Sequence, residues 1–159
     1  MITTKIKIKA HLAEYVKGWL AGCRDEPVSF PPGSDIYITI WDLMAKRPVN
    51  APAFDTGNLE IILPSRAVGK RPEYYNYLSA RSQSIIEKKI EEIMFEELHH
   101  RLRTNKRQGI TYIESIHWFM CEYGINSISE DAYKKEFYRL RRNEFNRRKK
   151  EKNYSEQMA

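Results

Sequence analysis

Residues 111–129 read TYIESIHWFMCEYGINSIS and contain one whole helix and the start of the next. Thr111 and Glu114 have the spacing of a capping box, which opens a helix. Gly124 suits the left-handed position just after a helix, because it has no Cβ to clash there. Ser129 is then placed to cap the following helix. The stretch therefore predicts two helices joined by a short turn.

A longer helix is predicted before this stretch. From Ser79 onward, apolar residues recur at three- and four-residue spacing, which indicates one buried stripe on an amphipathic helix. Ser84 and Glu87 form a second capping box, and we expect this helix to end near Gly109. Residues 79–150 are thus predicted to form a three-helix module.

The last of the three helices has two different faces. Its apolar residues Tyr133, Phe137 and Leu140 fall on one face, toward the other two helices. The opposite face carries long cationic side chains, an aromatic ring and an amide. Arg and Asn can make bidentate contacts with base edges in the major groove, and cations can hold phosphates. The residues predicted to contact the groove are Lys135, Tyr138, Arg139, Arg142 and Asn146. Those predicted to contact phosphates or a neighbouring groove are Arg147, Arg148, Lys149 and Lys150.

The charge of the chain is concentrated on this helix. The sequence has 27 Lys and Arg against 21 Asp and Glu, a formal net charge of +6. Residues 134–152 contain ten basic and three acidic residues, a net charge of +7, so the rest of the chain carries −1. A basic element on a nearly neutral body is typical of proteins that bind the nucleic-acid backbone. A solvated basic tail is the alternative interpretation.

An apolar pattern of known type links the last two helices. It runs Ile-x2-Ile-x3-Met-x2-Tyr-Gly-Ile from Ile113 to Ile125, and Ser-x3-Tyr-x3-Phe-x2-Leu from Ser129 to Leu140. In this pattern, residues 79–150 resemble a trihelical, homeodomain-like helix-turn-helix module. Its departure is the five-residue connection, which is longer than the three or four residues usual in the motif. Such modules occur in small accessory proteins of bacterial prophages and transposable elements. The resemblance implies a DNA-binding regulator or accessory factor of a mobile element.

The N-terminal part, residues 1–78, is predicted to be a small αβ portion of unknown role. Its expected elements are a strand over 3–10, a helix over 12–20 and a strand over 58–63. Ser34 can cap a further helix that ends before Pro48, with a strand over 37–40 as the alternative. The fold class is therefore α+β, with a disordered tail at 151–159. Unpaired strand edges suggest a homodimer that pairs through these strands.

Several classes of protein are excluded by composition. The apolar stretches are too short for a transmembrane helix, and the N-terminus has no apolar signal region, so we expect a cytoplasmic protein with no membrane partner. Cys23 and Cys121 are far apart, which indicates reduced thiols and neither a zinc finger nor a disulfide framework. Cys121 is expected in the core, and His117 is expected to be a partly buried packing residue.

Candidate reactive groups are few. Glu96 and His99 form half of the motif that di-iron bundles use twice. Asp55 and Glu60 flank the second strand and would have to hold Mg²⁺ in a nuclease. Neither pair makes a convergent set, so we predict no enzyme, no catalytic residue, no metal, no cofactor and no small-molecule substrate. The predicted partner is double-stranded DNA. The alternatives are an assembly protein whose basic helix docks on an acidic protein, or an RNA-binding protein.

Overall fold

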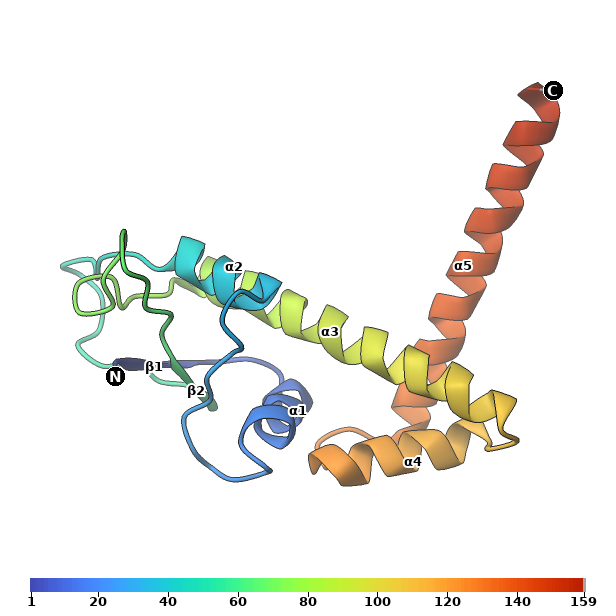
Figure 1. The fold of residues 1–159 in the computed structure, drawn as a ribbon, viewed down its shortest axis with the longest axis horizontal. Helices are drawn as coiled ribbons and strands as arrows, with labels where there is room; N and C mark the ends of the chain where they lie inside the picture. Colours follow the sequence, from blue (N-terminus) through green and yellow to red (C-terminus); the bar gives the residue numbers. More distant parts are fainter. Residues whose placement is uncertain (159) are drawn as a thin grey trace.

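The computed structural model describes residues 1–158 and is mostly helical (Figure 1). Within these residues there are five helices and one two-stranded sheet. Their bounds are β1 Thr3–Ile6, α1 Ala10–Leu20, α2 Asp35–Leu43, β2 Leu59–Ile62, α3 Ala80–Arg107, α4 Tyr112–Tyr123 and α5 Glu130–Met158. The chain therefore mixes helix and strand, as predicted, and each predicted strand and helix has a counterpart.

The two strands pair with each other in antiparallel register. Thr4 lies opposite Ile61 and Ile6 lies opposite Leu59, and all four of these side chains are buried. Because side chains alternate along a strand, the neighbouring residues face outward. Val28 forms a parallel bridge to Ile61 on the other edge of β2. The strands thus find partners within one chain, and the homodimer through these strands stays a prediction.

Residues 34–44 form a helix and not the alternative strand. The Ser34 hydroxyl accepts a hydrogen bond from the backbone N–H of Tyr37 at 3.3 Å and so caps α2. Ile36 and Ile40 are buried, one turn apart. The helical spacing of these buried residues outweighs the β propensity of the segment.

The long helix α3 begins where the helical pattern begins, but its cap is not the predicted one. Ser79 caps it by accepting a hydrogen bond from the backbone N–H of Ser82 at 3.2 Å. Ser84 lies in the second turn and is exposed, so the predicted capping box at Ser84 and Glu87 is wrong. Glu87 instead accepts a hydrogen bond from the backbone N–H of Lys9 at 3.0 Å. Its carboxylate therefore ties α3 to the segment between β1 and α1.

One hydrophobic core joins the two predicted parts of the chain. The buried stripe of α3 contains Ile86, Ile90, Met94, Leu98 and Leu102. Helix α2 packs against α3, and α1 packs against both α3 and α4. Residues 1–78 and 79–150 therefore bury their apolar surfaces against each other, with α3 as the shared element.

The caps of α4 and α5, and the turn between these two helices, have the predicted geometry. The Thr111 hydroxyl accepts a hydrogen bond from the backbone N–H of Glu114, and Gly124 has a φ of 65° in the left-handed region. Ile125 is buried, and its backbone N–H donates to the carbonyl of Met120 at 2.9 Å. The Ser129 hydroxyl accepts from the backbone N–H at position 132 and caps α5. These caps fix where α5 leaves the body.

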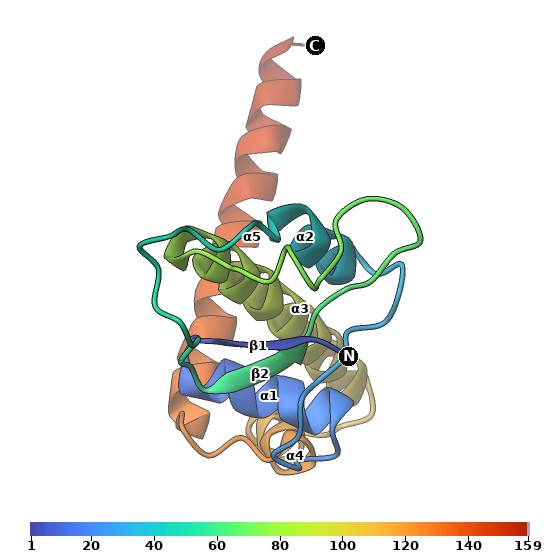
Figure 2. The ribbon, with the colours of Figure 1, turned by 90° about the vertical axis from the view of Figure 1, so that its left-hand side faces the viewer.

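Helix α5 continues to Met158, so the disordered tail predicted at 151–159 is wrong for residues 151–158, while residue 159 lies outside the described residues. Two ion pairs support these turns: Arg147 pairs with Glu151 and Lys152 pairs with Glu156, and in each pair the partners lie one turn apart. Figures 1 and 2 show the C-terminal half of α5 projecting from the body, on the side away from α4. In the described part of the chain, no helix combines the length and the apolar character needed to span a membrane.

Candidate nucleic-acid interface

Helix α5 is anchored to the body only through its first half. Tyr133 and Phe137 are fully buried, and the Tyr133 hydroxyl donates to the sulfur of Met94 in α3 at 3.3 Å. Arg141 donates to the Tyr112 hydroxyl at 3.1 Å. A 29-residue helix is about 43 Å long, so roughly half of α5 extends past these anchors.

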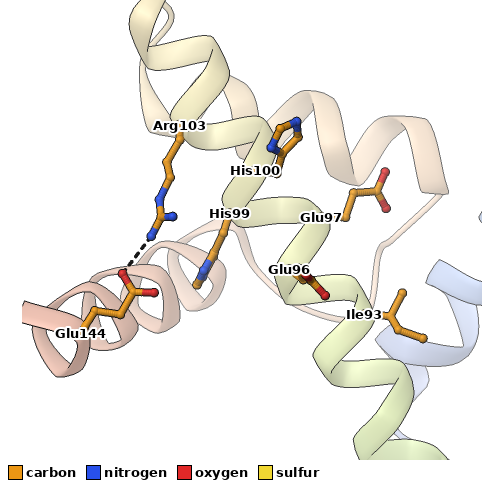
Figure 3. A pocket seen from close by; sticks show the side chains of 7 residues that line it. All are labelled: Ile93, Glu96, Glu97, His99, His100, Arg103 and Glu144. Atoms are coloured by element: carbon orange, nitrogen blue, oxygen red, sulfur yellow. Dashed lines mark hydrogen bonds and ion pairs between the residues drawn. The ribbon is translucent and has the colours of Figure 1, made fainter. Parts of the chain in front are cut away.

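The last polar link between α5 and the body is an ion pair. Arg103 of α3 donates to Glu144 at 2.8 Å (Figure 3). Within the described chain, no hydrogen bond or ion pair joins residues 145–158 to another element. This segment therefore presents its side chains to solvent on most of its circumference.

All nine residues predicted to contact DNA are exposed on α5. Four of them lie on one arc because about 100° separates successive residues of a helix. These four are Lys135, Arg142, Asn146 and Lys149. Tyr138 is 45% exposed and lies beside the same arc. Four of the five side chains predicted to contact the groove thus lie on one outward surface with Lys149, and we call this surface the basic arc. The fifth, Arg139, is ion-paired with Glu136.

The three acidic residues within 134–152 are all engaged in ion pairs. Glu136 pairs with Arg139, Glu144 pairs with Arg103, and Glu151 pairs with Arg147. Five of the predicted cations have no ion pair with any side chain of residues 1–158. They are Lys135, Arg142, Arg148, Lys149 and Lys150. Three of these five, Lys135, Arg142 and Lys149, lie on the basic arc, so its charge is available to an external anion.

The structure adds two arginines that the sequence did not assign to the site. A cavity of about 370 Å³ is lined by Arg103, Arg141, Glu144, Phe145 and Arg148. It brings three guanidinium groups and one carboxylate together where α5 leaves α3. Arginine forks bind phosphate oxygens in two-point contacts, so this cavity is a second cationic surface between α5 and α3, on the side of α5 away from the basic arc. The sequence shows a run of cations near the end of α3, which could have indicated this site. Only the crossing of α3 and α5 brings Arg103 of that run next to α5.

Glu96 and His99 have no third potential metal ligand grouped with them among residues 1–158. Both line a cavity of about 580 Å³ between α3 and α5 (Figure 3). The His99 ring packs edge-on against Phe137 at 5.0 Å, and its buried Nε2 atom has no hydrogen-bond partner within the described chain. Burial and the charge of Arg103 lower the pKa of His99. Residues 1–158 hold no cluster of three or more metal-ligating side chains.

Asp55 and Glu60 do not converge either. Asp55 accepts hydrogen bonds from Thr4 at 2.5 Å and from Arg47 at 2.8 Å. Glu60 accepts from Thr3 at 2.8 Å. Because Thr3 and Thr4 are adjacent in β1, their side chains point to opposite faces of the sheet. The two carboxylates are therefore held apart by the strand pleat, and a shared Mg²⁺ between them has no geometric support.

Two expectations about α4 are wrong. Cys121 is exposed and not in the core, because it lies on the side of α4 that faces neither α1 nor α3. His117 is 56% exposed, and its Nδ1 atom lies at hydrogen-bond distance, 2.6 Å, from a carboxylate oxygen of Glu130. Positions 115, 116, 119, 120 and 123 of α4 carry its buried side chains in place of these two.

A second cationic cluster lies at the other end of the body. Trp41 of α2 is covered by Arg66 at 4.9 Å and by Lys70 at 5.6 Å from the ring centroid. Lys70 also donates to the carbonyls of Trp41 and Asp42 at the end of α2. Gly69 approaches the Trp41 ring so closely that a Cβ would overlap it. These cations hold the loop after β2 against α2, so their first role is structural.

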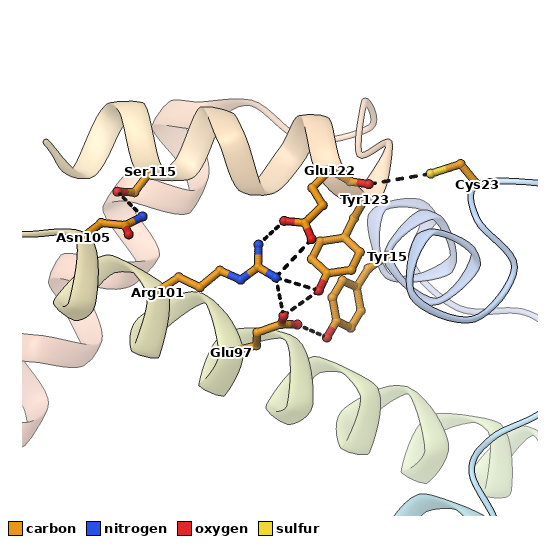
Figure 4. Close-up of polar contacts among 8 residues, drawn as sticks. All are labelled: Tyr15, Cys23, Glu97, Arg101, Asn105, Ser115, Glu122 and Tyr123. Carbon is orange, nitrogen blue, oxygen red and sulfur yellow. Dashed lines mark hydrogen bonds and ion pairs between the residues drawn. The ribbon is translucent and has the colours of Figure 1, made fainter. Parts of the chain in front are cut away.

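A polar network links the three helices α1, α3 and α4 of the body. Glu97 of α3 accepts hydrogen bonds from Tyr15 of α1 and Tyr123 of α4, and it pairs with Arg101 (Figure 4). Arg101 also pairs with Glu122. Burial raises the pKa of Tyr15 and of Tyr123, and the hydrogen bond from Arg101 lowers the pKa of Glu122. The network joins α1, α3 and α4 into one rigid support.

No protein-family model matches the chain, and searches of curated proteins and of solved structures find no protein similar to it. The function is therefore inferred from the charge and geometry of α5.

Proposed function

We propose that the protein binds double-stranded DNA through the basic arc of α5. The observation that carries this proposal is the row of unpaired, exposed cations on a helix that projects from its body. Such a row does not stabilise the helix itself, because like charges on one face repel each other. A phosphate backbone neutralises them and releases counterions, which drives binding.

The dimensions of α5 suit the major groove. An α-helix with its side chains is about 10–12 Å across, and the groove of B-DNA is about 12 Å wide. The 14 residues from 145 to 158 add about 21 Å of helix beyond the last ion pair with the body.

The side chains divide into two roles by their chemistry. Arg142 and Asn146 lie one turn apart, and their planar polar groups can each make two hydrogen bonds to a base edge. Lys149 and Lys150 carry compact charges that suit phosphates. Arg148 lines the cavity with Arg103, on the side of α5 away from the basic arc, so it has no assigned contact with a duplex bound on the arc.

The alternatives predict different competitors. If α5 binds an acidic protein, an acidic polypeptide should compete best for the basic arc. If α5 binds RNA, single-stranded RNA should compete best, because its unpaired bases can stack on aromatic side chains. The described residues of α5 offer Tyr138 and Phe145 as exposed rings, 45% and 67% exposed. The role at a mobile element that the resemblance implies stays a prediction.

A competition experiment tests the proposal. A fluorescent random duplex is bound by the full chain, and its anisotropy is followed as unlabelled duplex, single-stranded RNA or polyglutamate is added at equal charge concentration. We expect the duplex to compete at the lowest concentration. Preferential displacement by RNA or by polyglutamate, or no binding of the duplex at low salt, would overturn the proposal.

A further inference from the structure

Three side chains at the junction of α4 and α5 form a chain of contacts. The Cys121 Sγ atom lies 3.6 Å from His117 Nε2, and His117 Nδ1 lies 2.6 Å from a carboxylate oxygen of Glu130. Cys121 and His117 are one turn apart on α4, and Glu130 is the first residue of α5. The turn at Gly124 brings these two elements together.

The carboxylate determines which ring nitrogen carries the proton. Glu130 accepts, so Nδ1 of a neutral His117 ring holds the hydrogen and donates it. The remaining nitrogen, Nε2, then has a free lone pair directed at the thiol of Cys121. An imidazole oriented by a carboxylate and placed against a thiol is the arrangement that activates nucleophilic cysteines in enzymes.

The thiol is also accessible. Cys121 is exposed, and it lines a cavity of about 450 Å³ with His117, Gly124, Asn126 and Glu130 among the other lining residues. A small electrophile can therefore reach the sulfur, and the cavity can accommodate an added oxygen atom. No buried side chain has to move.

We propose that Cys121 is a peroxide-reactive thiol that is activated by His117 and oriented through Glu130. The proton of the thiol passes from Sγ to Nε2. The sulfur then attacks one oxygen of hydrogen peroxide, the O–O bond breaks, and an S–O bond forms. The departing hydroxide takes the proton from Nε2 and leaves as water. The products are a sulfenic acid at Cys121, one water molecule and neutral His117, so the sulfur is oxidised and the peroxide is reduced.

The chain contains its own control thiol. Cys23 is also exposed, but its Sγ atom contacts the backbone carbonyl of Glu122 at 3.9 Å and has no hydrogen bond to an ionisable side chain of residues 1–158. The two cysteines therefore differ in the imidazole and the carboxylate more than in their access to solvent. This inference is independent of DNA binding.

The test compares the two cysteines in one sample. The intact protein is treated with hydrogen peroxide, sulfenic acids are trapped with dimedone, and mass spectrometry of the peptides gives the rate at each cysteine. We expect Cys121 to react at least about fivefold faster than Cys23. In His117→Gln, the rate at Cys121 should fall to within about twofold of the rate at Cys23, and in Glu130→Gln it should fall to an intermediate value.

The same spectra decide against the proposal if the two cysteines react equally in the unchanged protein, or if His117→Gln leaves the rate at Cys121 as it was. Because His117 is exposed, its variant should fold, and the rate at Cys23 in each variant reports a general change in accessibility.

Discussion

The hydroxyl of Tyr15 in α1 donates a 2.6 Å hydrogen bond to the Glu97 carboxylate in α3. The ring of Tyr15 is 1% exposed and packs against Phe119 and Tyr123 of α4. One side chain thus links the N-terminal part of the chain to two helices of the C-terminal part. The support from which α5 projects depends on this link.

Removal of the Tyr15 hydroxyl should destabilise the protein. Tyr15→Phe leaves a partly buried carboxylate without one of its donors, so we expect the free energy of unfolding to fall by about 1–3 kcal/mol in urea denaturation. Tyr154→Phe, at a side chain that is 65% exposed near the end of α5, is the matched control. It should change the free energy by less than about 0.5 kcal/mol. Equal effects of the two substitutions would contradict the role of the Glu97 network.

The start of α3 can be tested with two serines. Ser79→Ala removes the hydroxyl that accepts the Ser82 backbone hydrogen bond, so we expect a loss of about 1 kcal/mol in the same assay. Ser84→Ala, in an exposed second turn, should be neutral or slightly stabilising because alanine has the higher helix propensity. The opposite order of effects would mean that the helix begins at Ser84.

Two histidines should make stability depend on pH. Burial lowers the pKa of His99 and of His11 below the ordinary value of 6.5. As the pH falls below about 6.5, the unfolded chain takes up protons that the folded chain does not, so the free energy of unfolding falls. We expect this loss between about pH 7 and pH 5.5, before most carboxylates titrate.

The decrease with pH should be shallower in His99→Gln than in the unchanged protein. His100→Gln, at the adjacent exposed position, is the control and should keep the original slope. Urea denaturation at a series of pH values gives these slopes. A slope that is unchanged in His99→Gln would show that the ring is not responsible.

Base recognition and phosphate contacts should separate in two variants of α5. Arg142→Ala should weaken binding to a preferred site by about 1–3 kcal/mol and reduce its preference over random duplex. Lys150→Ala should weaken binding to all sequences alike and reduce the salt slope by about one unit. Titrations on both duplexes measure these effects. If the two variants behave identically on every sequence, the assignment of Arg142 to the groove is wrong.

Much of the local structure follows from the sequence because short-range signals decide it. The Thr111 cap, the left-handed Gly124 and the Ser129 cap each depend on residues within four positions, and all three are confirmed. The cap of α3 was misplaced because Ser79 and Ser84 both precede helical residues. Burial of Leu78, which a local pattern does not show, favours the earlier start.

Contacts between distant segments account for what the sequence did not predict. The pairing of β1 with β2, the position of Arg103 beside Glu144, and the contact of His117 with Glu130 all depend on how elements cross. The sequence analysis predicts a disordered tail at 151–159. The spacing of its opposite charges instead supports a continuous helix.

The central claim is that the basic arc of α5 supplies the charge that binds DNA. The most direct measurement is the salt dependence of duplex affinity, between about 50 and 300 mM salt, for two full-length variants that each lose four positive charges. The first replaces Lys135, Arg142 and Lys149 of the basic arc, together with the adjacent Lys150, with Gln. The second replaces Lys5, Lys7, Arg81 and Lys88, which are exposed on the body, with Gln.

We predict that the first variant loses most of its affinity and that its slope against the logarithm of salt concentration falls by about three to four units. The second variant should keep the slope of the unchanged protein. Equal losses in the two variants would contradict the claim, because net charge and not α5 would then govern binding.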